Sequence, residues 1–294
     1  MRAVRVHGYG GAEVMRLDDV PIPQAGEGHV LVKVRAASVN PIDWKMRRGL
    51  LKAIFPLTFP RTLGRDCAGE VDGKLVAGVA DPRGEGTHAE YALLPQASTA
   101  PVPVGLDAAE AASLCIAGLS AWIALVEAAK VQKGMRVLIH GGAGGVGGHA
   151  IQIARELGAH VVTTSTQVDY CRQLGAERVI DYRKEDFAAA GPFDVVLDTL
   201  GGEAHVRSLE ALKPNGMLVA LSATPIPAHP PRTDVRVERP MIQANRERLG
   251  QIFDWVIKGR LRPQVTRRFH LEAANDAYAA VEAPHGRGKI VLET

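Results

Sequence analysis

A glycine-rich loop between an apolar strand and a helix constrains the fold of this chain more than any other feature. Residues 135–140 predict a compact strand, and residues 150–157 predict a helix. Between them, Gly142, Gly144 and Gly147 form the pattern GxGxxG. In this context the pattern predicts a dinucleotide site. A diphosphate lies against backbone N–H groups at a helix N-terminus, and side chains there would hold the backbone away from it.

The segments after the loop alternate between strands and helices. Strands are predicted at 160–164, 178–180, 194–198 and 217–221, with helices at 168–174 and 203–212 and a turn at 213–216. The alternation predicts an α/β fold with a doubly wound parallel sheet of the Rossmann kind, at residues 113–244. Residues 1–112 predict short strands and turns, and residues 245–294 leave the βα pattern. We expect these two segments to form a second, β-rich domain that is split in the sequence.

Composition excludes several classes of protein. Hydrophobic residues make up 46% and charged residues 23% of the 294, which is typical of a folded globular chain. The net charge of +3 is not gathered in a basic run, so we expect no nucleic-acid partner. No apolar stretch has the length of a membrane span or a signal peptide. The three cysteines form no CxxC pair. We therefore expect a soluble, reduced, cytoplasmic protein with no membrane partner.

The second strand of the dinucleotide domain ends in hydroxyl groups. A strand that selects NAD usually ends in Asp or Glu, which binds the ribose 2′-hydroxyl. Here Thr164 and Ser165 stand at that end, so a 2′-phosphate meets no repulsion and finds hydroxyl donors. Positive charge could come from Arg172, Arg183 and Lys184, although no cation lies in 163–169 itself. We predict NADPH as the cofactor, with NADH less favoured.

Five further motifs occur in order around the glycine loop. They are 39–45 (VNPIDWK), 63–69 (LGRDCAG), 89–91 (AEY), 117–122 (AGLSAW) and 287–292 (RGKIVL). Together they resemble the zinc-independent quinone oxidoreductase branch of the medium-chain dehydrogenase/reductase superfamily, over nearly the whole chain. The resemblance implies a GroES-like catalytic domain beside the Rossmann domain, NADPH as the usual cofactor, and a homodimer.

The positions of the zinc ligands are occupied by other residues in this chain. Zinc-dependent relatives place a Cys where Asn40 stands, a His where Arg65 stands, and a Cys near Ile116. None of these three side chains replaces a thiolate or imidazole ligand of Zn²⁺. We predict that no metal is bound, and we exclude a zinc alcohol dehydrogenase.

The resemblance also implies cofactor contacts outside the GxGxxG glycines. The residues it assigns are Ser120, Gly145, Val146, Thr164, Ser165, Tyr182, Leu200, Ser222 and Arg287. Of these, Tyr182 would flank the adenine ribose, and Ser120 and the Leu200 turn would lie near the nicotinamide. Two segments, 71–89 and 222–246, are shorter than is usual in the family, and a basic residue common after the second Rossmann strand is replaced here.

Three polar residues of the motif 39–45 are the catalytic candidates. Asn40 is expected to donate to a carbonyl or to the nicotinamide edge. Lys45 is expected to hold the ribose hydroxyls or relay a proton, with Asp43 as its countercharge. Alternatively, Asp43 and Lys45 cap and pair within a loop structurally.

Two functions stay open at this point. One is an NADPH-dependent oxidoreductase that reduces quinones or α,β-unsaturated carbonyl compounds. The other is an NADPH-binding sensor or structural protein with vestigial catalysis, since a fold alone does not determine a function.

An alternating segment near the end of the dinucleotide domain predicts an edge strand. Residues 234–239 (DVRVER) alternate and are followed by Pro240. An exposed strand edge tends to be paired or covered, and a two-fold axis beside it would join two sheets into one. We therefore expect a homodimer; an ordinary surface loop is the alternative for this segment.

Overall fold

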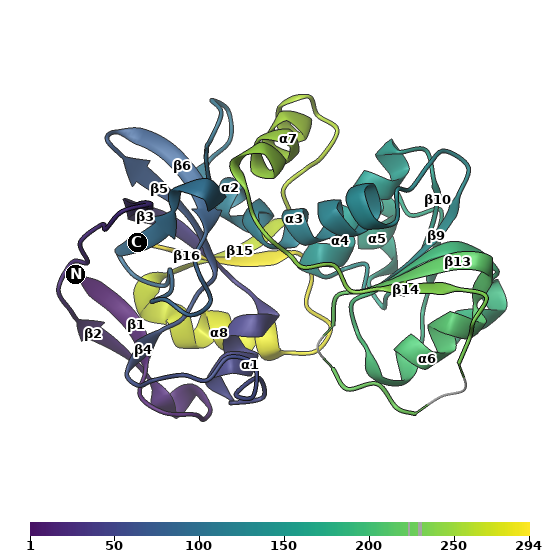
Figure 1. The fold of residues 1–294 in the computed structure, drawn as a ribbon, viewed down its shortest axis with the longest axis horizontal. Helices are drawn as coiled ribbons and strands as arrows, with labels where there is room; N and C mark the ends of the chain where they lie inside the picture. Colours follow the sequence, from purple (N-terminus) through teal and green to yellow (C-terminus); the bar gives the residue numbers. More distant parts are fainter. Residues whose placement is uncertain (223, 229–230) are drawn as a thin grey trace. The chain divides into compact units, whose positions relative to one another are not determined.

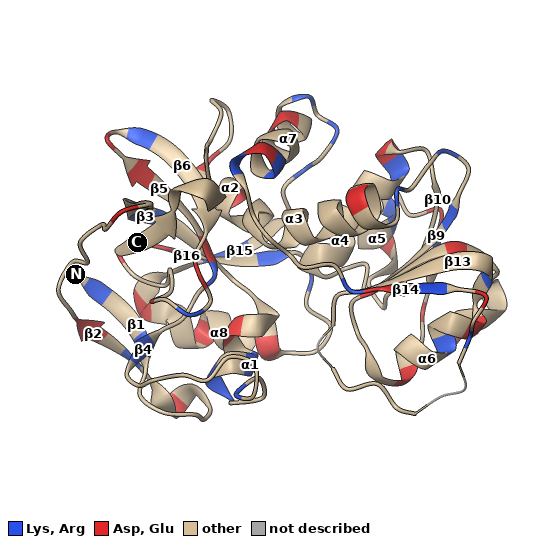
Figure 2. Ribbon diagram, in the orientation of Figure 1, with Lys and Arg blue, Asp and Glu red and all other residues tan. Residues whose placement is uncertain are grey.

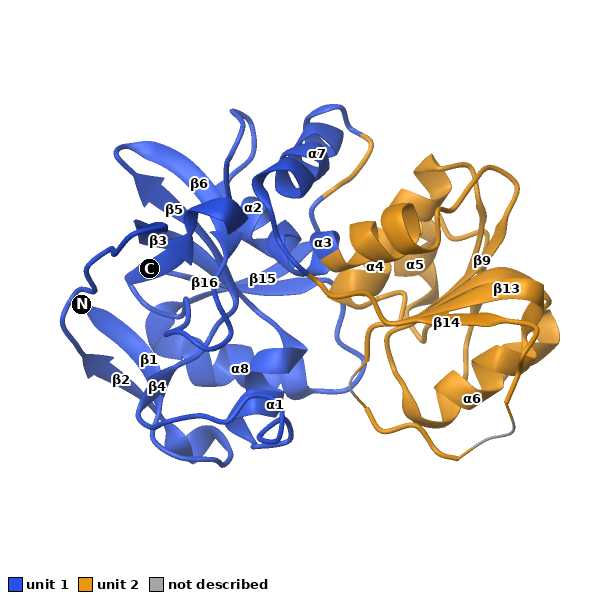
Figure 3. Ribbon diagram, viewed as in Figure 1, with its two compact units in different colours: residues 1–119, 243–259, 263–294 blue, residues 120–242, 260–262 orange. Residues whose placement is uncertain are grey.

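The chain folds into two compact units (Figure 3). The computed structural model describes residues 1–222, 224–228 and 231–294. Unit 1 contains Met1–Leu119, Gln243–Gly259 and Pro263–Thr294, and unit 2 contains Ser120–Ile242 and Arg260–Arg262. Lys and Arg are interspersed with Asp and Glu along both units (Figure 2), so no segment stands out as basic.

Unit 2 is built on a six-stranded parallel sheet of order β11-β10-β9-β12-β13-β14. Its strands are β9 (Arg136–His140), β10 (His160–Thr164), β11 (Arg178–Ile180), β12 (Phe193–Asp198), β13 (Leu212–Ala220) and β14 (Arg236–Glu238). Its helices are α4 (Gly145–Glu156), α5 (Val168–Leu174) and α6 (Gly202–Glu210). The helices α4 and α5 cover one face of the sheet and α6 the other (Figure 1). This is the predicted doubly wound Rossmann sheet.

The strand order reverses between β9 and β12, which lie side by side at the middle of the sheet. Ligands of open α/β sheets bind beyond the carboxyl ends of the strands at such a reversal. The glycine loop follows β9 directly, so the topology places it at this point. Leu138, Val196 and Leu218 of three neighbouring strands are buried in the core beneath it.

One expectation for unit 2 is wrong. The helix predicted to end at residue 212 ends at Glu210, and residues 213–216 are part of β13 rather than a turn before it. The strand register shifts between Phe193 and Val195, and Asn215 has a φ of +64°. The turn-forming residues therefore make a bulge inside a longer strand, because Leu212 already pairs with Phe193.

Unit 1 contains two sheets. Antiparallel strands β1 (Arg2–Val6), β2 (Met15–Asp19) and β4 (Arg61–Thr62) form the order β2-β1-β4. The larger sheet has the order β15-β16-β3-β5-β6-β8, with β7 also paired to β3. Its strands are β3 (His29–Val39), β5 (Asp66–Val71), β6 (Lys74–Val79), β7 (Tyr91–Pro95), β8 (Thr99–Pro101), β15 (Val265–His270) and β16 (Lys289–Glu293). This is the predicted β-rich, GroES-like partner of the Rossmann sheet.

The two ends of the sequence meet within unit 1. The last strand, β16, runs antiparallel to β3 and pairs Ile290 with Val39. Helices of this unit are α1 (Pro41–Arg47), α2 (Ala108–Cys115), α7 (Arg246–Ile257) and α8 (Ala274–Glu282). A further helical stretch, α3 (Ala117–Trp122) with the π-helical turn Ile123–Ala128, leads into unit 2. The β3–β16 pairing explains why the C-terminal segment leaves the βα pattern.

No single helix of the described ranges is long and apolar enough to cross a bilayer. One pair passes that test together by length and composition, Ala108–Cys115 with Ala117–Ala128, and it is bent by 42°.

The open edge of the unit 2 sheet leads to a prediction about assembly. Strand β14 pairs with β13 on one side only, and its residues Arg236, Val237 and Glu238 are all exposed. We predict a homodimer through this edge, with a mass of twice 31.4 kDa by light scattering at micromolar concentration. Val237→Lys should shift the protein to monomer, because a charge on an edge strand opposes pairing.

Ile22→Lys is the matched control for this experiment. Ile22 is 48% exposed and Val237 is 46% exposed, but Ile22 lies outside any strand. This variant should stay dimeric. A monomeric wild-type protein would contradict the prediction.

Candidate functional site

The glycine loop forms a cradle at the N-terminus of α4. A Cβ at Gly142 would collide with Thr163 Oγ1, and one at Gly147 would collide with the carbonyl of Gly141, so packing alone requires these two glycines. Gly144 is different. It is the N-cap residue, and a Cβ there would meet only the carbonyl oxygen of Gly141, at 3.3 Å.

No side chain caps the helix start at Gly144. The first N–H groups of α4 therefore have no side-chain acceptor within the described residues, which fits a helix N-terminus that binds a diphosphate.

Of the two hydroxyls at the end of β10, that of Thr164 contacts the glycine loop. Thr164 Oγ1 accepts from the backbone N–H of Gly141 at 3.3 Å and lies 3.1 Å from His140 Nδ1. Ser165 Oγ accepts from the backbone N–H of Gln167 at 3.0 Å. Both side chains are buried, so Thr164 holds the glycine loop rather than facing outward.

The cations expected near a 2′-phosphate are partly neutralised by one carboxylate. Arg183 Nε lies 3.1 Å from Asp181 Oδ1, and Lys184 Nζ lies 3.8 Å from Asp181 Oδ2. Hydrogen bonding to Arg183 lowers the pKa of Asp181, so this carboxylate stays charged. Tyr182 between them is 49% exposed. Arg172, also exposed, lies on α5.

Two predicted cofactor residues, Leu200 and Ser222, lie together at the carboxyl edge of the sheet. Ser222 Oγ donates to the Leu200 carbonyl at 2.9 Å. The Leu200 turn is in turn held by Asp198, whose Oδ1 accepts from the N–H groups of Leu200 and Gly201 at 2.9 and 2.8 Å. Thr199 Oγ1 donates to the carbonyl of His140 at 2.8 Å, which joins this turn to the strand before the glycine loop.

Sequence reasoning did not identify which polar groups pair to build this edge. Asp198 Oδ2 lies 2.8 Å from His205 Nδ1, and both side chains are buried. His140 Nε2 lies 2.8 Å from Ser208 Oγ. Burial lowers the pKa of His140 to about 4, so the ring is neutral at pH 7 and bridges Thr164 to α6 by hydrogen bonds. The sequence feature that could have revealed these contacts is Asp198 at the end of an apolar strand, because a buried carboxylate needs hydrogen-bond partners.

In unit 1, Asn40 and Asp43 start helix α1. The backbone N–H of Asn40 donates to Asp43 Oδ2 at 2.7 Å, and the Asn40 side chain accepts from the N–H of residue 43, which completes a capping box. Pro41 occupies the first helical position. The motif 39–45 is therefore a helix start.

The expected pairing of Asp43 with Lys45 is wrong. Asp43 is fully buried at the helix cap, whereas Lys45 Nζ lies 5.7 Å from the centroid of the Trp44 ring. Within the described chain no ion pair joins the two, because residues two apart on a helix point in different directions. The half-buried Lys45 has a pKa that burial lowers from its ordinary value.

A buried lysine that sequence reasoning left without a role organises this part of unit 1. Lys289 Nζ donates to Asn40 Oδ1 at 2.6 Å and to the carbonyl of Val39 at 3.2 Å, and the residue is only 4% exposed. Asn40 Nδ2 donates to Asp66 Oδ1 at 3.0 Å and also contacts Ser38. The amide of Asn40 is thus engaged within the protein. The sequence feature that could have revealed the role of Lys289 is a lysine inside an otherwise apolar strand.

The buried carboxylates of Asp43 and Asp66 and the ammonium of Lys289 stabilise one another's charged forms. Asp66 accepts from Ser38 Oγ at 2.7 Å and from the N–H of Ile116 at 3.0 Å. Burial raises the pKa of Asp43 to about 6 and raises that of Asp66, while Lys289 acts in the opposite direction on both. Burial lowers the pKa of Lys289, and the two carboxylates oppose this.

The described residues include no group of three or more His, Cys, Asp or Glu that could hold a metal ion. Cys67, Cys115 and Cys171 are free and buried. Metal-free chemistry stays a prediction that rests on the residue types at 40, 65 and 116.

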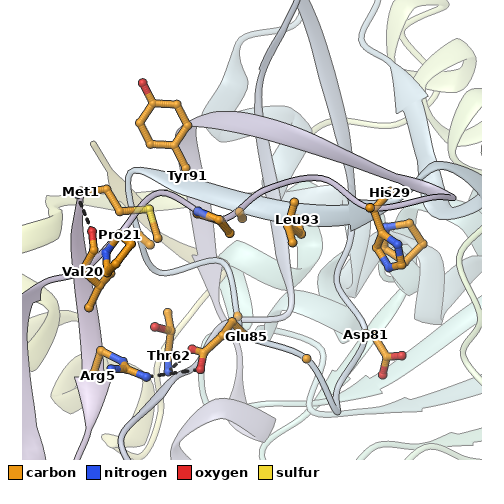
Figure 4. A pocket seen from close by; sticks show the side chains of 17 residues that line it. Met1, Arg5, Val20, Pro21, His29, Thr62, Asp81, Glu85, Tyr91 and Leu93 are labelled. Atoms are coloured by element: carbon orange, nitrogen blue, oxygen red, sulfur yellow. Dashed lines mark hydrogen bonds and ion pairs between the residues drawn. The ribbon is translucent and has the colours of Figure 1, made fainter.

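A separate cavity of about 430 Å³ lies in unit 1 beside β7 (Figure 4). Its walls include Val20, Tyr91 and Leu93. Arg5 Nη2 donates to Glu85 Oε1 at 3.3 Å, and Figure 4 shows these two side chains beside each other. None of the predicted site residues lines it.

Comparisons with known proteins cover both units. Residues 26–104 match the family described as Alcohol dehydrogenase GroES-like domain, and residues 174–292 match the one described as Zinc-binding dehydrogenase. A relative named Quinone-oxidoreductase QR1, chloroplastic, from Triphysaria versicolor is 32% identical over 100% of this chain and 98% of its own length. Trans-enoyl reductase pgmF from Aspergillus terreus is 32% identical over 94% of this chain and 90% of its own.

Solved structures share the whole fold. The quinone oxidoreductase from Coxiella burnetii is 34% identical, with a TM-score of 0.91 over 100% of this chain and 99% of that one. A mycobacterial structure described as complexed with NADPH has a TM-score of 0.89 at 28% identity, and a structure described as an NAD-dependent alcohol dehydrogenase has 0.92 at 28%. Both of these cover 100% of each chain.

The buried ammonium leads to a prediction about stability. Lys289→Met should lower the free energy of unfolding by about 3–5 kcal/mol, because it leaves the buried carboxylates of Asp43 and Asp66 without their cation. Urea unfolding followed by circular dichroism measures this change. Lys33→Met, at an exposed position of β3, is the control and should change stability by no more than about 0.5 kcal/mol. Equal stability of the two variants would contradict the assignment.

Proposed function

Because this chain belongs to the medium-chain dehydrogenase/reductase superfamily and is an oxidoreductase, we propose that it reduces quinones or α,β-unsaturated carbonyl compounds with NADPH and without a metal. The observation that carries the proposal is the glycine cradle at the start of α4, at the point where the strand order reverses. Relatives named as a quinone oxidoreductase and a trans-enoyl reductase support the substrate class.

The residues of unit 2 fit a dinucleotide. The N–H groups at the start of α4 would hold the diphosphate, and the Leu200 turn, braced by Ser222 and Asp198, would line the nicotinamide end. Once bound, the cofactor supplies a hydride donor. The absence of a carboxylate at Thr164 and Ser165 supports NADPH over NADH.

In unit 1 the candidate proton donor is Lys45. Its ammonium is not paired with Asp43, and its pKa is lowered by burial, which makes a proton easier to release at neutral pH. Asn40 and Asp43 act indirectly in this proposal, because they start the helix that carries Lys45.

The cradle itself gives the first test. Gly144→Ser should fold with a stability within about 1 kcal/mol of wild type, because serine is a favoured N-cap residue. Its side chain enters the diphosphate space and competes for the same N–H groups, so NADPH should bind at least about tenfold more weakly. Cofactor fluorescence titration measures the affinity. Unchanged affinity in a folded variant would place the diphosphate elsewhere.

Cofactor choice is the second test. NADPH should bind at least about tenfold more tightly than NADH, a difference of about 1.4 kcal/mol or more. The same titration with the two cofactors decides it. Equal affinities would mean that the end of β10 does not distinguish the 2′-phosphate.

The role of Lys45 is the third test. An enone needs a proton on carbon, whereas the oxyanion of a reduced quinone can take one from water. Lys45→Ala should therefore lower kcat about tenfold or more with an enone, and less with a quinone. Lys52→Ala, at an exposed position nearby in the sequence, should match the wild type for both.

Two outcomes bear on the alternatives. Wild-type rates in Lys45→Ala for both substrates would leave this helix without a catalytic role. A wild-type protein that binds NADPH but oxidises it with no quinone or enone would favour the sensor or structural protein. We propose a cytoplasmic location from composition; the relative from Triphysaria versicolor is named as chloroplastic.

A further inference from the structure

We propose that Arg65 is a catalytic residue that binds the substrate oxygen on which negative charge develops during hydride transfer. The inference rests on the proposed function, and it assigns to unit 1 the group that stabilises the product of hydride addition.

Arg65 is a partly buried cation whose guanidinium forms no hydrogen bond to the described residues. It lies in the turn between β4 and β5. Its Nε is buried with no hydrogen-bond partner, and the described residues offer its guanidinium no ion pair or hydrogen bond. Burial lowers its pKa, which marks the loss of water around the charge. A buried N–H without an acceptor is unfavourable, so this arrangement indicates a ligand that offers an oxygen as hydrogen-bond acceptor.

A second arginine of the same unit shows how this chain satisfies a structural guanidinium. Arg47, 2% exposed, forms an ion pair with Glu282, donates to the carbonyl of Gly10, contacts Met15 Sδ and lies 5.4 Å from the Tyr278 ring centroid. The guanidinium of Arg47 is therefore engaged by partners within the protein. Arg65, in the turn before β5, has no comparable set of hydrogen bonds within the described residues.

The carboxylates around Arg65 hold it by charge alone. The negative groups that face it are Asp43, Asp66 and Asp81, and each opposes the effect of burial on its pKa. The hydrogen-bonding capacity of Asp66 is taken by Ser38, Asn40 and Ile116.

Asp43 differs from Asp66 in having one carboxylate oxygen to spare. Its Oδ2 is used by the backbone of Asn40, and its Oδ1 has no partner. No hydrogen bond joins this oxygen to Arg65 within the described residues, so the N–H groups of Arg65 are left to bond a substrate oxygen.

The chemistry of the proposed reaction produces such an oxygen. With an enone, hydride forms a C–H bond at the β-carbon, and the electron pair of the C=C bond moves toward the carbonyl. The oxygen then carries negative charge until the α-carbon takes a proton. A guanidinium stays charged throughout and cannot supply that proton, but its fork of N–H groups suits an oxyanion. Arg65 thus stabilises charge, while the proton comes from Lys45 or water.

Kinetics of matched variants test the assignment. Arg65→Met should lower kcat/KM for both a simple quinone and an enone by about a hundredfold or more, with the Kd for NADPH changed less than twofold. The variant should still fold, with a lowered Tm, because Asp43, Asp66 and Asp81 lose a facing cation. Arg65→Lys should recover part of the rate. Arg61→Met is the control. Arg61 lies in β4, four positions before Arg65, and this variant should keep the wild-type kcat/KM.

A binding measurement separates this inference from the proposed function. With NADP⁺ present, 4-nitrophenolate is an aromatic oxyanion whose absorbance reports its binding. It should bind the wild-type protein at least tenfold more tightly than Arg65→Met. If the wild-type protein turns over no quinone or enone but shows this difference, the proposed function fails and the Arg65 site stands. Equal kcat/KM in Arg65→Met, or equal affinity for the phenolate, overturns the Arg65 assignment.

Discussion

Unit 1 depends on the buried ammonium of Lys289, which joins the last strand of the sequence, β16, to the end of β3 near the start. A buried charge must be paired, and here the partners are Asn40 Oδ1 and the carbonyl of Val39, with Asp66 and Asp43 close by. Satisfying that one group sets the register of β16 on β3. It also orients the side chain that starts α1, and so it places the helix that carries Lys45.

Unit 2 is also organised by hydrogen bonds between buried polar groups, at the carboxyl edge of its sheet. Buried polar groups join the ends of neighbouring strands: Asp198 holds the Leu200 turn, and His140 joins Thr164 to Ser208. The close contacts of the glycine loop are made at Gly142 and Gly147. A Cβ at Gly144, by contrast, would meet one carbonyl oxygen, so the N-cap position stays accessible. A supported loop, and N–H groups that no side chain of the described residues caps, are what an anion site at a helix N-terminus requires.

The polar residues of unit 1 fall into two physical groups. Asn40, Asp43, Asp66 and Lys289 bond to one another and are saturated or nearly so, and their work is to position the backbone. Lys45 and Arg65 make no hydrogen bond to that cluster within the described residues, although Asp43 and Asp66 face Arg65 by charge, so their N–H groups are available to a ligand. The expectation that Asn40 itself donates to a substrate came from its place in the motif, which does not reveal that its amide is already engaged.

The sequence by itself determined the features that local patterns encode: the glycine loop between β9 and α4, the alternation of strands and helices in unit 2, the edge strand β14, and the acid-free end of β10. Each depends on residues close together in the chain. Only the tertiary structure decided which polar groups pair. Asn40 and Lys289 are 249 residues apart, Asp66 meets Ile116 across 50, and Asp43 turns to the helix cap rather than to Lys45. Such partners follow from strand pairing over long separations, and no local periodicity records them.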